Sequence, residues 1–108
     1  MTEIKVIKGD KGYDLNFTLQ KADGTALDLT GATLLFKCQK HDASTVKFSG
    51  SMTITNPPGT DGKCKYTVQA TDFDEAGKYD GEIEVTYGST QILTFTDILI
   101  EVVAELPK

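Results

Sequence analysis

The chain contains one histidine, His41, and therefore one candidate for a catalytic base that works near neutral pH. Hydrolysis by nucleophilic attack needs a Ser, Cys or Thr placed against such a histidine. His41 lies close to Ser44 within a short polar segment that has the composition of an exposed turn. We interpret this segment as a solvated turn, so the sequence predicts no catalytic nucleophile.

Three acidic residues, Asp72, Asp74 and Glu75, lie close together before Tyr79. Two carboxylates at a defined separation can hydrolyse glycosidic bonds, and carboxylate oxygens can bind calcium. The spacing is not the Asp-x-Asp-x-Asp-Gly pattern of a calcium loop. Acidic side chains also cap and solvate turns, and this role accounts for all three residues. We therefore predict that the protein is not an enzyme.

Two cysteines, Cys38 and Cys64, are too few for a disulfide scaffold. Each shares the alternation of neighbouring apolar residues, so both are expected to face the core. We favour two buried free thiols; a disulfide between them stays open, because it depends on their Cα separation. With a single histidine and no second cysteine two to four residues from either, we expect no metal site and no cofactor.

The charge balance excludes two classes of partner. The formal net charge is −5, and the lysines are scattered. Nucleic acids and anionic membrane surfaces both select basic patches, so we expect neither as a partner. The first residues lack the apolar stretch of a signal peptide, so the chain is either made in the cytoplasm or is a module of a larger exported chain.

Turn residues recur about every eight to twelve positions, and the apolar residues between them mostly alternate. This pattern predicts short strands, with Gly50 as a bend or bulge in the fourth. In the last strand the parity changes between Phe95 and Ile98, which favours a bulge near residues 96–97 or burial of both faces. The expected strands include residues 4–6, 15–19, 34–38, 46–54, 64–70, 79–87 and 91–103.

The step from Asp74 through Gly77 to Tyr79 is typical of a tyrosine corner, where the chain crosses between the sheets of a sandwich. The tyrosine ring is then buried, and its hydroxyl bonds to backbone between residues 71 and 75. These three residues are our predicted structural site. Together with the strand pattern they predict one domain, residues 1–108, folded as an all-β, immunoglobulin-like antiparallel β-sandwich of about seven strands.

Two segments carry most of a resemblance to a known family: Gly9-Asp10-Lys11-Gly12 and Asp28-Leu29-Thr30-Gly31-Ala32-Thr33. With Ala76-Gly77-Lys78-Tyr79 further on, their order resembles the N-terminal immunoglobulin-like domain of phage baseplate upper proteins. The resemblance covers nearly the whole chain. It implies a virion structural part of a phage or prophage tail or baseplate, synthesised in the bacterial cytoplasm without a signal peptide. The implied partners are other tail or baseplate proteins, with a homo-oligomer left open.

An alternative function is an adhesion or carbohydrate-binding sandwich that contacts a host cell surface. Its candidate aromatic contacts are Tyr13, Phe73 and Tyr87, although a chain without Trp lacks the best sugar-stacking residue. The long last strand also carries more apolar residues than one core-facing side needs. We therefore predict a docking surface there, formed by Ile92, Leu93, Phe95, Leu99 and Val103.

Overall fold

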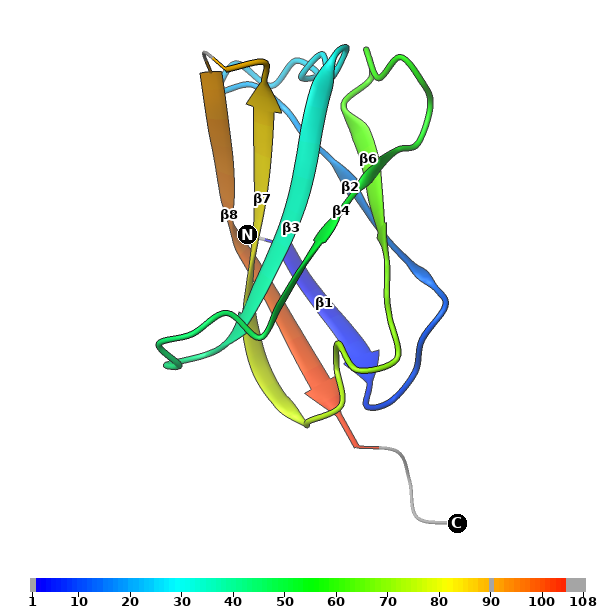
Figure 1. The fold of residues 1–108 in the computed structure, drawn as a ribbon, viewed down its shortest axis with the longest axis vertical. Coiled ribbons are helices and arrows are strands. Elements are labelled where there is room, and N and C mark those ends of the chain that lie inside the picture. Colours follow the sequence, from blue (N-terminus) through cyan, green and yellow to red (C-terminus); the bar gives the residue numbers. More distant parts are fainter. Residues whose placement is uncertain (1, 90, 105–108) are drawn as a thin grey trace.

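The computed structural model describes residues 2–89 and 91–104. In this part of the chain the regular secondary structure consists of β-strands alone. The strands form two layers (Figure 1). The larger sheet has the order β1-β8-β7-β3-β4, and the smaller sheet has the order β2-β6-β5. The strands are β1 (Thr2–Ile7), β2 (Asp14–Thr18), β3 (Ala32–Lys40), β4 (Phe48–Ser51), β5 (Thr53–Ile54), β6 (Lys63–Thr67), β7 (Gly77–Tyr87) and β8 (Gln91–Val103).

The strand order is that of an immunoglobulin-like sandwich. β3, β7 and β8 are antiparallel neighbours in one sheet, and β2, β6 and β5 are antiparallel neighbours in the other. The predicted all-β sandwich is therefore confirmed. One pair departs from the antiparallel rule, because β1 runs parallel to β8 from Thr2 opposite Ile98 to Ile7 opposite Val103. The parallel pairing is compatible with the chain, since a long connection separates these two strands.

The segment over residues 46–54 differs from the single strand that was predicted, because it forms two strands in different sheets. β4 pairs with β3, and β5 pairs with β6. The chain crosses between the sheets at the buried Met52. Gly50 lies in regular pairing opposite Phe36, and a Cβ at this position would stand 2.7 Å from the ring of Tyr66. Gly50 is therefore required by ring packing, and it is not a bend.

β8 contains a bulge, which was one of the two explanations left open for its change of parity. Gly81 of β7 lies opposite Ile98, whereas Ile83 lies opposite Phe95, so β8 has one more residue than β7 between these pairs. The extra residue reverses the alternation of side chains along β8. As a result Ile98 is buried in the core, and Phe95 packs half-buried against the same core.

Aromatic rings fill the middle of the sandwich. Phe36 lies 5.7 Å from Phe17 and 5.1 Å from Tyr66, both from the opposite sheet, measured between ring centroids. Phe73 packs edge-on against Phe48, with a centroid distance of 5.3 Å. The expectation that Phe73 is an exposed aromatic is therefore wrong, because its ring completes this cluster and is buried.

Both cysteines are buried free thiols, Cys38 in β3 and Cys64 in β6. Burial raises the pKa of Cys38 to about 12 and the pKa of Cys64 to about 11. Both thiols are therefore protonated at neutral pH, and a buried neutral thiol is a poor nucleophile.

Candidate docking site

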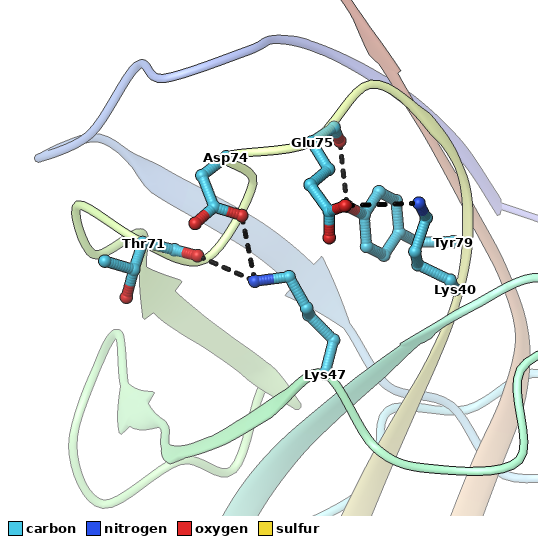
Figure 2. Close-up of polar contacts among 6 residues, drawn as sticks. All are labelled: Lys40, Lys47, Thr71, Asp74, Glu75 and Tyr79. Atoms are coloured by element: carbon cyan, nitrogen blue, oxygen red, sulfur yellow. Dashed lines mark hydrogen bonds and ion pairs between the residues drawn. The ribbon is translucent and has the colours of Figure 1, made fainter.

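Tyr79 closes one end of the sandwich and forms the predicted tyrosine corner (Figure 2). Its ring is fully buried and packs edge-on against Phe73, with 5.6 Å between centroids. Its hydroxyl donates a hydrogen bond of 2.8 Å to the backbone carbonyl of Glu75, inside the expected range of residues 71 to 75. Burial, and then the nearby Glu75 carboxylate, raise the pKa of the tyrosine hydroxyl, so the donor stays protonated.

Two lysines hold the turn before this corner in place, as Figure 2 shows. The Nζ of Lys47 lies 2.9 Å from a carboxylate oxygen of Asp74 and donates to the carbonyl of Thr71 at 3.0 Å. Lys40 pairs with the Glu75 carboxylate at 3.7 Å. The hydrogen bond from Lys47 is the main cause that lowers the pKa of Asp74. Asp74 thus ties the turn to the segment that precedes β4.

Gly77 opens β7 with a φ of +136°, a backbone conformation that side-chain-bearing residues rarely adopt. A Cβ at this position would meet only the Cε of Lys40, at 3.9 Å. Glycine is therefore favoured here by backbone conformation and not by lack of space.

The acidic residues before the corner do not converge on a common point. Asp72 is buried, accepts a hydrogen bond of 2.5 Å from the hydroxyl of Tyr66, and accepts a second one from the backbone N–H of Gln69. Asp74 and Glu75 each bind a different lysine. Each carboxylate thus has its own structural partner, which is unlike the facing pair of a glycosidase.

His41 is exposed at the end of β3, and its Nδ1 lies 3.1 Å from a carboxylate oxygen of Asp80. Within residues 2–89 and 91–104, no group of three or more His, Cys, Asp or Glu side chains could hold a metal ion. The contacts of His41 are those of a surface residue on a sandwich.

The first half of β8 forms an open edge of the larger sheet. β7 pairs with β8 along almost its whole length, from Gln91 to Val102. β1 pairs with the other side of β8 only over residues 98–103. In Figure 1, β1 accordingly begins about half-way along β8. Within the part of the chain that the structure describes, residues 91–97 therefore have a strand on one side only.

Two backbone hydrogen bonds show in which direction the N–H and C=O groups of these strands point. His41 donates its N–H to the carbonyl of Lys78 at 2.9 Å, so the backbone groups of Lys78 point toward β3 and those of Tyr79 point toward β8. In agreement, Lys8 donates to the carbonyl of Val103 at 2.8 Å, which turns Val103 toward β1. Odd-numbered residues of β7 therefore direct their N–H and C=O groups to β8.

The same alternation identifies the backbone groups on the open edge. Val85 of β7 is odd-numbered, so its backbone groups meet those of its partner Leu93. The backbone N–H and C=O groups of the residues before and after Leu93 must point away from β7. Ile92 and Thr94 therefore turn their N–H and C=O groups away from β7, toward the side that has no strand.

The five residues of the predicted docking surface lie along β8 but on two faces. Leu93 and Phe95 face the sandwich and are half-buried against the core. Ile92 has the opposite parity, faces outward, and is 61% exposed. Leu99 and Val103 also face outward and are half-buried, in the half of β8 that β1 covers. Only the first three residues border the open edge.

Residues 1–107 match the family described as the BppU N-terminal domain. The chain belongs to this family. The BppU N-terminal domain is part of the phage baseplate upper protein, so the resemblance seen in the sequence is confirmed. No curated protein has a significantly similar sequence.

The BppU N-terminal domain is a phage baseplate domain, and its family implies a structural role, association with other baseplate proteins and a place in the virion. The family indicates no catalytic domain. Among the described residues, no helix could cross a membrane by length and hydropathy.

The sequence did not reveal the lysine contacts of the corner or the open half of β8. Lys47 is distant from Asp74 in sequence, and no local pattern links the two residues. The open edge depends on where β1 starts relative to β8, which is a long-range register. The local signal in the sequence was the excess of apolar residues in the last strand, which led to the predicted docking surface.

Proposed function

We propose that this BppU N-terminal domain is a single-domain structural module of a phage or prophage tail or baseplate, acting in the virion through protein–protein contacts and without catalysis. In this proposal Asp74, Gly77 and Tyr79 stabilise the fold, and β8 carries the docking surface. The observation that supports it most strongly is the open half of β8, which combines unpaired backbone groups with the apolar side chains of Ile92 and Phe95.

The other edges of the sandwich are better protected than this one. Natural sheet edges are usually short or carry charges, which disfavours the addition of a foreign strand. The solvent-exposed side chains of β1 include those of Glu3 and Lys5, and β2 begins with Asp14. β4 and β5 have four and two residues. Residues 91–96 of β8 form the longest run of uncharged residues on these edge strands, so we regard this edge as the best suited to docking.

The alternative function in carbohydrate binding has less support. An aromatic platform needs exposed rings, whereas Phe73 is buried and both Tyr13 and Tyr87 are half-buried against the core. No second function is therefore proposed.

The proposed function is tested in the phage itself. Deletion of the gene should yield particles with absent or incomplete baseplates, and the chain supplied in trans should restore them. Mass spectrometry and antibody labelling of purified wild-type particles should place the chain at the tail tip. Normal infectious particles without the chain would contradict the proposal, as would binding of the purified chain to host glycans in place of any tail component.

A further inference from the structure

We propose that the open edge of β8 binds the same edge of a second copy of this chain, so that the two larger sheets join into one continuous antiparallel sheet. This inference rests on the docking role proposed for β8 and specifies its occupant. The direction of the backbone groups, the pattern of side chains and the distribution of charge along β8 support this pairing.

The backbone geometry favours a two-fold arrangement centred on Thr94. The uncovered part of β8 runs from residue 91 to residue 97, and Thr94 is its midpoint. Thr94 turns its N–H and C=O to the open side, as derived above from the register with β7. Two antiparallel copies related about this residue would each donate the Thr94 N–H to the Thr94 carbonyl of the other. β1 begins opposite Ile98, so among the described residues the added strand would pair with the part of β8 that β1 does not cover.

The side chains match in the same register. Position 93 of one copy would lie opposite position 95 of the other, so Leu93 and Phe95 would form cross-strand apolar pairs on the inner face. A depression lined by residues of β2 and β8, among them Asn16 and Thr96, lies beside Phe95. On the outer face, Ile92 would pack against Thr96 of the second copy.

The charge pattern allows two acidic chains to meet at this edge. Each copy has a formal net charge of −5, which opposes association over most of the surface. Residues 91–96, which would form the paired stretch, are uncharged. Like charges would therefore not be placed opposite one another, which is the arrangement that destabilises paired strands.

Cysteine cross-linking tests the register directly. Opposed residues that exchange backbone hydrogen bonds have Cα atoms about 5.5 Å apart, which is within the range that a disulfide spans. Thr94→Cys should therefore form disulfide-linked dimers under mild oxidation, whereas the native thiols are buried and do not compete. Val46→Cys is the matched control, because Val46 is 51% exposed and lies outside β8. In a preformed dimer the Thr94→Cys reaction should be about tenfold or more faster than the control reaction.

An independent measurement follows the oligomeric state by analytical ultracentrifugation over a range of concentrations. The wild-type chain should form dimers, Ile92→Lys should shift the equilibrium to monomers, and Val46→Lys should leave it unchanged. Because Ile92 is largely exposed, its variant should keep the wild-type Tm within about 3 °C. Equal cross-linking at the two cysteine positions would overturn the proposal, as would a chain that stays monomeric at every soluble concentration.

The outcomes also separate this inference from the proposed function. Cross-linking of Thr94→Cys in assembled particles to a different baseplate protein would overturn the second-copy proposal and leave the docking role intact. A dimer of the purified chain, together with particles that do not need the chain, would support the paired edge and refute the baseplate function.

Discussion

Removal of one hydroxyl group in Tyr79→Phe measures what the tyrosine corner contributes to stability. The phenylalanine ring would keep the edge-on contact with Phe73 and the burial in the core. The variant loses only the hydrogen bond of 2.8 Å to the backbone carbonyl of Glu75. The difference in the free energy of unfolding therefore reports the loss of this single bond and any new hydration of its acceptor.

The expected size of the effect follows from the surroundings of that carbonyl. A buried acceptor that loses its donor costs about 1 to 3 kcal/mol. This bond is only partly buried and Glu75 is an exposed residue, so the loss should lie near the lower end, about 1 to 1.5 kcal/mol. For a domain of about this size each kcal/mol lowers Tm by about 4 to 8 °C. Urea unfolding followed by circular dichroism gives the free energy, and a thermal scan gives Tm.

Tyr87→Phe is the matched control for this measurement. Tyr87 also donates its hydroxyl to a backbone carbonyl, that of Asp28 at 2.6 Å, but this bond is exposed to solvent. Its loss should change the free energy of unfolding by about 0.5 kcal/mol or less. The reasoning about the corner is refuted if the two variants lose the same stability, because burial would then not distinguish the two bonds.

Four further predictions use other parts of the fold. Gly50→Ala should cost about 1 to 3 kcal/mol in urea unfolding, because the new Cβ would stand 2.7 Å from a buried tyrosine ring; a neutral result would contradict the packing argument. The pKa values of Cys38 and Cys64 are raised in the folded chain from 9.0 to about 12 and about 11, so the folded state holds protons that the unfolded state releases. Stability from these groups should be fully present below pH 9 and should be lost as pH rises through 11 and 12, and a urea midpoint that is constant from pH 8 to 11 would refute this. Labelling with a thiol reagent should be slow in the native state and reach two equivalents in denaturant, whereas zero equivalents would show a disulfide. Lys47→Met should cost about 1 kcal/mol or less, because both the lysine and its carboxylate partner are partly exposed, and high salt should reduce the difference; a loss unaffected by salt would contradict an ionic contribution.

The sequence alone determined the class of the fold and the location of the corner. Alternation of apolar residues sets which side chains of a strand face the core, because successive side chains point to opposite faces. For the same reason the change of parity in residues 91–103 indicated a bulge or burial of both faces, and the structure has the bulge. The tyrosine corner was predictable because Asp74, Gly77 and Tyr79 lie within six residues and their roles are local.

Other features were decided only by the tertiary structure. Alternation cannot say which strand lies next to which, so the division of residues 46–54 between two sheets followed from pairing with β3 and β6. The contact between Lys47 and Asp74 likewise requires the two segments to be brought together by the packed sandwich.

The candidate docking edge belongs to this second group. The sequence showed an apolar and uncharged stretch at residues 91–96, but it did not show that this stretch lacks a partner. That property depends on the register in which Thr2 meets Ile98, since β1 then covers only the second half of β8. Strand pairing between the two ends of a chain is set by the whole core, because it is the packing of both sheets that positions the ends. Local composition therefore determined that the edge is apolar and uncharged, and the tertiary structure determined that it is open.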